Sequence, residues 1–392
     1  MSMEKTRLKL GIAPLVDCAA IVVGKERGFF AEQGLDVHIS REPSWANIRD
    51  KLALGSLDAA QMLAPQPISM TLGLGPIREP VIAAMGLGQG GNTITIGAAL
   101  CARMEAKGGP TNHALKAVID DDKAQGRPVL TLAMPYPFST HHYELRYWLA
   151  AAGIDPDRDV RLSVVPPPLM VGHLSAGNIA GFCVGEPWGS LAASMELGQV
   201  VATSDDIFAG RLEKVLGVTR SWAESHPETL KAMLKALINA GQWCDANRAE
   251  LAGIVAQPAY VNVPVDVVRH ALTKPGAPVF SAHAANFPWR SQAMWYMREM
   301  QRWGHLPADI NARRLAEDIY RPDLYRMAAL ELGRPVPLTD YKSEGEHAAP
   351  WILTQATAPI AMGPDLLLDG ARFDPNATNA AAPAPAPKES TP

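Results

Sequence analysis

The order of strand-like and helix-like segments is the feature of this sequence that most constrains its fold. Short apolar runs alternate with amphipathic stretches through the first 96 residues, and a second block with the same rhythm begins at residue 97. Alternation of this kind is typical of a parallel sheet whose faces are covered by helices. We therefore expect an α/β protein with two lobes of similar construction, each built around a parallel sheet.

The individual segments follow from the spacing of apolar residues, from Gly and Pro, and from candidate N-caps. Strands are expected at residues 8–12, 36–40, 58–62, 81–86, 93–96, 129–134, 160–165, 179–184 and 200–203. Helices are expected at residues 16–30, 44–55, 67–74, 113–126, 140–152, 169–177, 221–247, 249–256, 265–273, 291–303, 307–318 and 322–332. The sequence after residue 220 is thus predicted to be mainly helical.

The lobes are predicted to be discontinuous in sequence. Lobe I would comprise residues 1–96 plus 203–345, with lobe II, residues 97–202, inserted between them, and residues 346–374 would form a C-terminal extension. Residues 375–392 are rich in Ala and Pro with few apolar anchors, so we expect them to be disordered. Ligands of open α/β sheets bind beyond the carboxyl ends of the strands, and clefts between domains are favoured sites.

Charge and hydropathy narrow the class of protein. The sequence has 36 basic and 40 acidic side chains and a net charge of -4. It lacks the excess of positive charge that direct nucleic-acid binding requires. No apolar run reaches the ~20 residues of a membrane-spanning helix. The N-terminal residues do not fit the pattern of a secretory signal, so we expect a soluble, cytoplasmic protein. The four cysteines are widely scattered, which suits reduced thiols, although the sequence does not exclude a disulfide bond.

Two loop positions in the expected lobe I could face a ligand. Trp45 follows Ser44 at a predicted helix start, where free backbone N–H groups favour an anion. Its ring would wall the ligand and its indole N–H would donate, but a hydrophobic anchor packed on the sheet is the alternative. Asn92 ends a Gly-rich turn between two strands. Its amide would be a neutral donor at the hinge, unless the turn is merely a flexible loop.

Two positions in the expected lobe II are also candidates. His141 opens a helix and could donate to an anion. The adjacent His142 does not share its helix face and no carboxylate partner lies nearby, which disfavours a metal. Val184 and Gly185 join a buried strand to a helix, and the glycine would let the backbone approach a small ligand closely. A tight strand–helix turn without function is the alternative.

A monoanion in a cleft also needs a positive charge. Lys214, just before a strand-like run, and Arg290 are the candidates, although either could be an ordinary solvated residue. No nucleophile elbow, P-loop, zinc signature or paired-carboxylate constellation accompanies these donors, and no general base has an orienting partner. We therefore expect a binding protein rather than an enzyme, with no cofactor and no metal.

Five segments carry a resemblance to a known family. They are residues 28–37 (GFFAEQGLDV), 42–45 (EPSW), 63–65 (LAP), 147–156 (YWLAAAGIDP) and 182–188 (FCVGEPW). In this order and spacing they resemble the nitrate/bicarbonate solute-binding proteins, the NrtA/CmpA family, over about residues 8–340. The resemblance implies a two-lobed, periplasmic-binding-protein-like fold of type II with the ligand in the cleft between the lobes.

The resemblance also implies a ligand and its contacts. Nitrate or nitrite would be held by Trp45, Asn92, His141, Val184, Gly185 and Lys214. The bicarbonate receptors carry a carboxylate at the lysine position, so Lys214 favours nitrate or nitrite. At the amide position this sequence has Asn92, whereas the nitrate receptors have a glutamine, which is one methylene longer. The resemblance therefore leaves the size and selectivity of the pocket open.

Members of this family that lack a signal peptide resemble the NasS-type cytoplasmic nitrate/nitrite sensors. That resemblance implies a regulator of nitrate assimilation that holds an RNA-binding antiterminator of the NasT type when empty and releases it on ligand binding. One alternative is the extracytoplasmic receptor of a nitrate ABC transporter, for which an upstream start codon could supply the export signal. Another is an enzyme related to the thiamine-pyrimidine synthases, using the neighbouring histidines.

Overall fold

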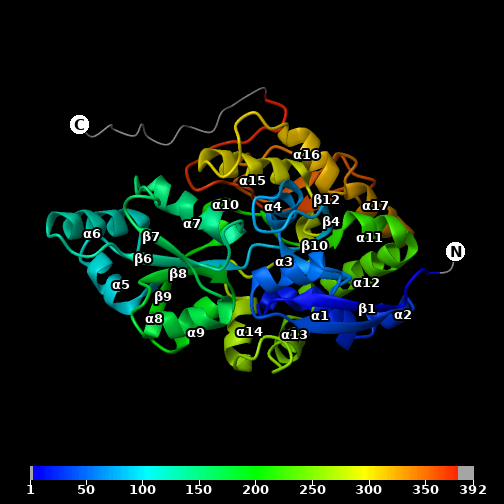
Figure 1. The fold of residues 1–392 in the computed structure, drawn as a ribbon, viewed down its shortest axis with the longest axis horizontal. Helices are drawn as coiled ribbons and strands as arrows, with labels where there is room; N and C mark the ends of the chain where they lie inside the picture. The colour runs from blue at the N-terminus through cyan, green and yellow to red at the C-terminus, as the bar shows by residue number, and fades with distance from the viewer. Residues whose placement is uncertain (1–2, 378–392) are drawn as a thin grey trace.

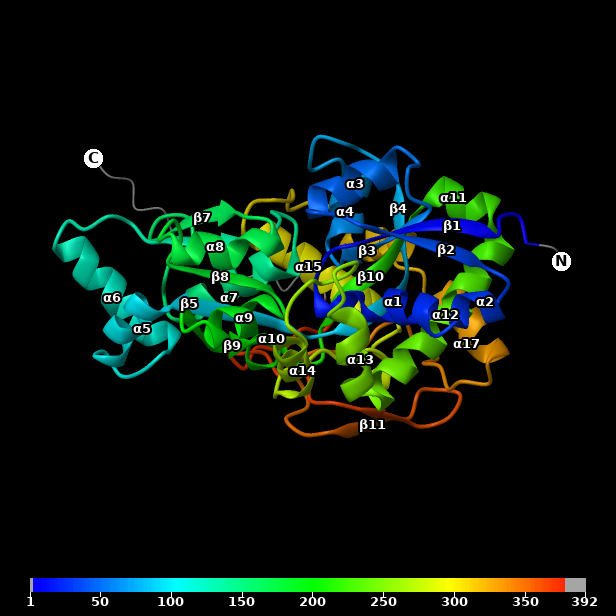
Figure 2. The same ribbon diagram turned by 90° about the horizontal axis from the view of Figure 1, so that it is seen from below.

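Two five-stranded sheets organise the molecule, and they lie next to each other in the views of Figures 1 and 2. The structure is a computed structural model that describes residues 3–377 of the chain. The first sheet has the order β2-β1-β3-β10-β4, formed by Asp36–Arg41, Arg7–Ile12, Ala59–Leu63, Leu212–Thr219 and Val81–Gln89. The second has the order β7-β6-β8-β5-β9, formed by Arg161–Val164, Thr131–Met134, Gly181–Gly185, Asn92–Gly97 and Gly198–Thr203. The chain crosses between the sheets twice, at Gly90–Gly91 and in the segment between β9 and β10.

The expectation of parallel sheets is wrong for part of each sheet. Strands β1, β2 and β3 pair in parallel, but β10 is antiparallel to both β3 and β4. In the second sheet β5 is antiparallel to β8 and β9. The reason is the path of the chain, which leaves the first sheet along β4 and returns along β10, so that these two strands must run in opposite directions. Local periodicity carries no information about that path.

Helices cover both sheets, as Figure 1 shows. Around the first sheet and leading into the second lie η1 (Val16–Cys18), α1 (Ala19–Glu26), α2 (Phe29–Glu32), α3 (Trp45–Ala53) and α4 (Gln66–Leu72). Within the second sheet's segment lie α5 (Ala98–Glu105), α6 (Asn112–Ala124), α7 (Thr140–Ala151), η2 (Pro167–Leu169), α8 (Met170–Ser175), α9 (Trp188–Ser194) and α10 (Ser204–Phe208). The rest are α11 (Arg220–Ser225), α12 (Pro227–Ala246), α13 (Arg248–Val255), α14 (Val265–Thr273), η3 (Ala282–Ala284), α15 (Arg290–Arg302), α16 (Ala312–Ile319) and α17 (Pro322–Glu331).

Two boundaries differ from the sequence-based expectation in ways that matter. The helix expected from residue 307 begins only at Ala312, where the Asn311 side chain caps it by accepting from Arg314 N–H. Strand β10 begins at Leu212, so Lys214 lies inside the strand and not before it. A lysine inside a central strand is buried from both sides, and this removes the solvated-surface alternative for Lys214.

Serine caps set the start of α3 and α7, the two helices that carry Trp45 and His141. Ser44 is extended and its hydroxyl accepts from Asn47 N–H, so α3 begins at Trp45. Ser139 accepts from His142 N–H in the same way, so α7 begins at Thr140 and places His141 in its first turn. Ser is among the preferred N-cap residues because its short side chain satisfies an otherwise unpaired backbone donor.

The C-terminal segment after α17 contacts both lobes. It contains the hairpin of β11 (Trp351–Leu353) and β12 (Ile360–Met362), of which β11 is labelled at the lower edge of Figure 2. Further on, Asp369 Oδ1 accepts from the Tyr147 hydroxyl of α7 at 2.7 Å. Arg313 of α16 donates to Pro375 O and Asn376 Oδ1, so the described part of the predicted tail, residues 375–377, contacts the first lobe. The remainder of that tail, residues 378–392, lies outside the described residues. Among the described residues, no helix combines the length and apolarity needed to span a bilayer.

A close backbone approach in the first sheet gives a stability prediction. Gly86 N–H in β4 donates to Asn286 O, and a Cβ at Gly86 would lie 2.3 Å from Ala285 O. Gly86→Ala should therefore destabilise the fold by about 1–3 kcal/mol, because backbone must shift. Gly253→Ala in α13, where a Cβ meets nothing within 4 Å, should instead stabilise it by about 0.5–1 kcal/mol. Urea unfolding measures both, and equal effects would contradict the prediction.

Candidate functional site

The residues predicted to bind a ligand lie together where the two lobes meet, and all of them are buried. From the first lobe come Trp45, at the start of α3, and Lys214, in β10. From the second come Asn92 at the start of β5, His141 in the first turn of α7, and the pair Val184 and Gly185 at the end of β8. Figures 1 and 2 place α3, β10 and the ends of the second sheet at the junction of the lobes.

Lys214 is the centre of this cluster and is an ammonium held by two carboxylates. Its Nζ lies 2.8 Å from Asp17 Oδ2 and 2.7 Å from Glu213 Oε1, and its side chain has no exposed surface. The same Nζ lies 5.5 Å from the centroid of the Trp45 ring, within cation–π range. Burial works against the charged form, but Asp17 and Glu213 outweigh it and raise the pKa of Lys214. The site therefore contains a permanent positive charge.

His141 is a neutral donor without a partner. Neither ring nitrogen has a hydrogen-bond partner among residues 3–377, although both are buried, and Nε2 lies 3.7 Å from Glu213 Oε1. Burial, together with the charge of Lys214, holds the pKa of His141 well below its usual value. A neutral imidazole still carries one N–H, so His141 can donate one hydrogen bond to a ligand.

Trp45 combines a fixed ring with an unused donor. The side chain of Gln66 donates to Trp45 O at 3.1 Å and so fixes the start of α3. The indole Nε1 is buried and has no hydrogen-bond partner in the part of the chain that the structure describes. A buried unpaired N–H costs about 1–3 kcal/mol, so this atom is suited to an acceptor that enters the site.

Gly185 and Asn92 bring the second lobe against the first. They pair across β8 and β5, and a Cβ at Gly185 would lie 2.6 Å from Leu15 Cδ2 and 3.3 Å from Asp17 Oδ2. Only glycine allows this approach of the two lobes. The Asn92 amide, expected to be a free donor, instead donates to Glu144 Oε2 at 2.7 Å and leaves its Oδ1 without a partner.

The structure adds four charged residues that the sequence reasoning did not assign to the site. Besides Asp17 and Glu213, a fully buried Arg211 donates to Glu144 Oε1 and, at 2.8 Å, to Glu213 Oε2. Against the effect of burial, Lys214 and Arg211 lower the pKa of Glu213 to about 2. The sequence offers one signal for Asp17, which is the single charged residue in the apolar run 12–23. No such signal exists for the other three.

A model of the NMT1-like family matches residues 1–257 of this sequence. The chain belongs to the NMT1-like family. It is 33% identical over 399 residues to the nitrate/nitrite binding protein NrtA of Synechococcus elongatus, covering 95% of this chain and 84% of that protein. The crystal structure of the periplasmic nitrate-binding protein NrtA from Synechocystis PCC 6803 superposes with a TM-score of 0.84 at 28% identity, over 96% of this chain and 97% of that one. The expected two-lobed fold and the resemblance to the NrtA/CmpA group are thereby confirmed.

Other relatives are larger than this NMT1-like chain. It is 38% identical over 364 residues to the nitrate import ATP-binding protein NrtC of Synechocystis, covering 88% of this chain and 52% of the relative. The bicarbonate transport ATP-binding proteins CmpC are matched over a similar share. The chain thus spans about half the length of the NrtC and CmpC relatives it matches.

Arg290, the second candidate cation, and His142, the neighbour of His141, have their partners outside the cluster in this NMT1-like chain. Arg290 at the start of α15 pairs with Asp340 and donates to Tyr320 O. His142 contacts Pro137 O, and its Nε2 accepts from Arg146 at 2.7 Å. Neither contributes a charge or a donor to the cluster, in which Lys214 and Arg211 are buried cations.

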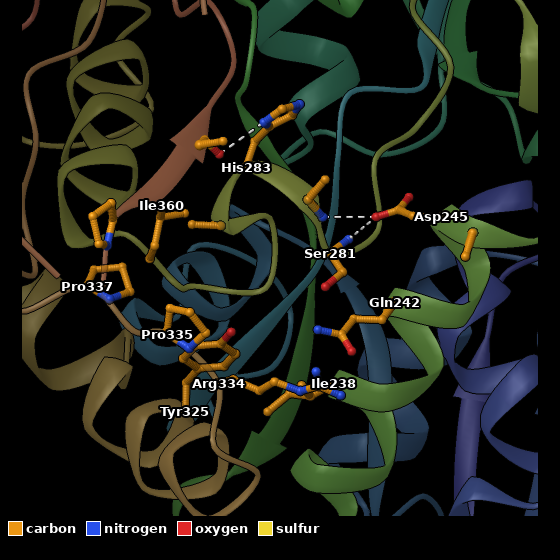
Figure 3. A pocket seen from close by; sticks show the side chains of 15 residues that line it. Ile238, Gln242, Asp245, Ser281, His283, Tyr325, Arg334, Pro335, Pro337 and Ile360 are labelled. Carbon is orange, nitrogen blue, oxygen red and sulfur yellow. Dashed lines mark hydrogen bonds between the residues drawn. The ribbon is translucent and has the colours of Figure 1, made fainter. Parts of the chain in front are cut away.

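A separate surface pocket of about 570 Å³ lies between α12, η3 and the C-terminal segment. Figure 3 shows its walls, with Asp245 accepting from the backbone of the 281–282 loop and His283 bonded to Ala361 O. None of the predicted site residues lines it. Its contacts hold the C-terminal hairpin against the first lobe.

Proposed function

We propose that this chain binds nitrate or nitrite at the junction of its lobes, with Trp45, His141 and Lys214 as donors. The observation that carries the proposal is that the buried N–H of Trp45 and the ring of His141 are unpaired beside a buried ammonium. A small oxyanion offers several acceptor oxygens and one negative charge, and would satisfy all three groups together. Similarity to NrtA, a nitrate/nitrite binding protein, favours these two anions. We expect binding without turnover, as in a transport receptor.

Calorimetric titration with nitrate, nitrite and bicarbonate tests the proposal. Nitrate and nitrite should bind with one site per chain, whereas bicarbonate should not bind measurably. Saturable bicarbonate binding in the absence of nitrate binding would contradict the assignment of the ligand.

Trp45→Phe tests the role of the indole N–H. Phenylalanine keeps most of the ring surface but removes the donor, so nitrate affinity should fall about tenfold, the loss of one hydrogen bond to a charged group. Two effects on stability oppose each other, because the substitution removes an unpaired buried N–H but leaves a void beside the smaller ring. Trp289→Phe is the matched control, since Trp289 Nε1 is equally buried and unpaired but lies at the start of α15. Equal effects of the two substitutions on affinity, measured by titration, would contradict the proposed role.

We further propose that the chain acts as a cytoplasmic sensor of the NasS type. In this role it holds an RNA-binding antiterminator of the NasT type when empty, and ligand binding releases that partner. All four cysteines are free and buried, which suits a reducing compartment. A two-lobed receptor can couple two ligands if the anion and the partner prefer different arrangements of the lobes.

The competing role is the substrate-binding component of a nitrate/nitrite ABC transporter, which the similarity to NrtA supports equally. Co-purification distinguishes the two. A sensor should retain a purified antiterminator on an affinity column and release it when nitrate is added. Retention of transporter membrane components, with no nitrate-sensitive antiterminator complex, would favour the transport role.

A further inference from the structure

Carboxylates surround the proposed anion site closely. Asp17 Oδ2 and Glu213 Oε1 already occupy two of the three donor positions of the Lys214 ammonium, at 2.8 and 2.7 Å. Behind them, Arg211 is shared between Glu144 and Glu213. With all groups ionised, the three carboxylates and two cations of this cluster sum to one negative charge, and all five side chains are buried.

A monoanion cannot simply be added to this arrangement. It would bring a second net negative charge into a buried site, and it would stand beside carboxylates that compete for the same ammonium. Buried charges are tolerated in proteins only when they are paired. Either the anion stays out, or one carboxylate must lose its charge when the anion enters.

We propose that the anion binds together with one proton, which Asp17 takes up as the anion replaces its carboxylate at Lys214. The proton comes from the solvent and ends on an oxygen of Asp17, while the Lys214–Asp17 ion pair gives way to a Lys214–anion pair. The net charge of the cluster is then the same before and after binding. This inference rests on the proposed function for the identity of the anion, and deepens it by naming how the site is regulated.

Asp17 is better placed than Glu213 to take the proton. Glu213 accepts from Thr140, Lys214 and Arg211, so neutralising it would leave three donors poorly paired. Among the described residues, the side-chain partners of Asp17 are Lys214 and the Gln61 amide. Burial raises the pKa of Asp17 in spite of Lys214, whereas the pKa of Glu213 is lowered.

Other titratable groups around Asp17 do not offer an equal alternative. On α7, His141 has a pKa well below its usual value because of burial and Lys214. The neighbouring thiols of Cys18 and Cys183 have raised pKa values and are already protonated. Glu186, which follows β8, is paired with Lys274 and accepts from Ser190 N–H. The charged and titratable groups that act on Asp17 are Lys214 and Glu213 of β10 and the thiol of Cys18. Glu144 accepts from Arg211 and Asn92 and not from Lys214, so the anion would not displace it.

Titration of nitrate at pH 8 in phosphate and in Tris buffer tests the proposal, because the two buffers release different heats when they give up a proton. The dependence of the binding enthalpy on buffer should correspond to about one proton taken up per nitrate. The nitrate Kd should rise up to about tenfold per pH unit above the pKa of Asp17 in the free protein. In Asp17→Asn the uptake should vanish and the Kd should become independent of pH. Asp122→Asn is the control. Asp122 is a buried carboxylate of α6 that pairs with Arg103 and Arg127, and its substitution should leave the proton uptake unchanged.

The outcomes separate this inference from the proposed function. Nitrate binding without proton uptake would overturn the inference and leave the proposed function intact, whereas the absence of nitrate binding at every pH would overturn both. Uptake that persists in Asp17→Asn would overturn the assignment to Asp17. Infrared difference spectra of the unmodified protein provide a second measurement if that variant does not fold. Nitrate should produce the C=O stretch of a protonated carboxyl, and its absence would count against the inference.

Discussion

Replacing Lys214 with methionine should abolish nitrate binding and destabilise the protein by about 3–5 kcal/mol, the range for breaking a buried ion pair. Methionine is unbranched like lysine and one atom shorter, and it leaves Asp17 and Glu213 without the ammonium that lies 2.8 and 2.7 Å from them. It also removes the positive charge that would offset the cost of taking an anion out of water. Calorimetric titration and urea unfolding measure the two effects on one preparation.

Two variants separate the loss of binding from the loss of stability. Lys342→Met breaks a second buried pair, with Glu344, in the C-terminal segment. It should destabilise the protein in a similar way and leave nitrate binding unchanged. The double variant Lys214→Met/Asp17→Asn removes one of the unpaired carboxylates, so it should recover part of the stability without recovering binding. Nitrate affinity within a few-fold of the unmodified protein in Lys214→Met would contradict the central role of this residue.

Arg211→Met should destabilise the protein by about 3–5 kcal/mol, because it leaves the buried carboxylate of Glu144 without its cation and takes one of two cations away from Glu213. Arg211 is fully buried and bridges Glu144 of the second lobe to Glu213 of the first. Its removal should raise the pKa of both carboxyl groups. The destabilisation should therefore shrink as the pH is lowered, since protonation removes the unpaired charges. Urea unfolding at pH 7 and at pH 5 measures this difference.

The exposed pair of Arg269 and Asp266 on α14 provides the control for that prediction. Its two side chains are 49% and 84% exposed, and they lie three residues apart on one helix. Exposed pairs of this kind contribute about 0–1 kcal/mol, so Arg269→Met should have little effect at either pH. A comparable loss of stability in both variants would mean that burial of Arg211 is not the cause.

Much of the fold could be predicted because its signals are local. The N-caps Ser44 and Ser139, the apolar strands and the Pro and Gly at helix ends depend on neighbours within a few residues. The direction of β10 could not be predicted. Whether Leu212–Thr219 runs parallel or antiparallel to Val81–Gln89 depends on where the chain has travelled in between, and periodicity is the same in both cases.

The site shows the same division. Trp45, His141 and Gly185 stand at element ends, where a sequence pattern or a family motif can find them. The partners of Lys214 come from positions 17 and 213, and those of Arg211 from positions 144 and 213. Their significance arises only when the lobes meet, because a carboxylate alone in the sequence is no different from one on the surface.

By itself the sequence determined the alternating α/β architecture, the family, and most of the donors that would face an anion. Only the tertiary structure decided that those donors share their site with three carboxylates, that the Asn92 amide is taken by Glu144, and that Lys214 is buried inside a strand. The physical reason is that donors are specified by residue type and local geometry. Charge balance in a buried site is specified by side chains from distant segments, which only the packing of the two lobes brings together.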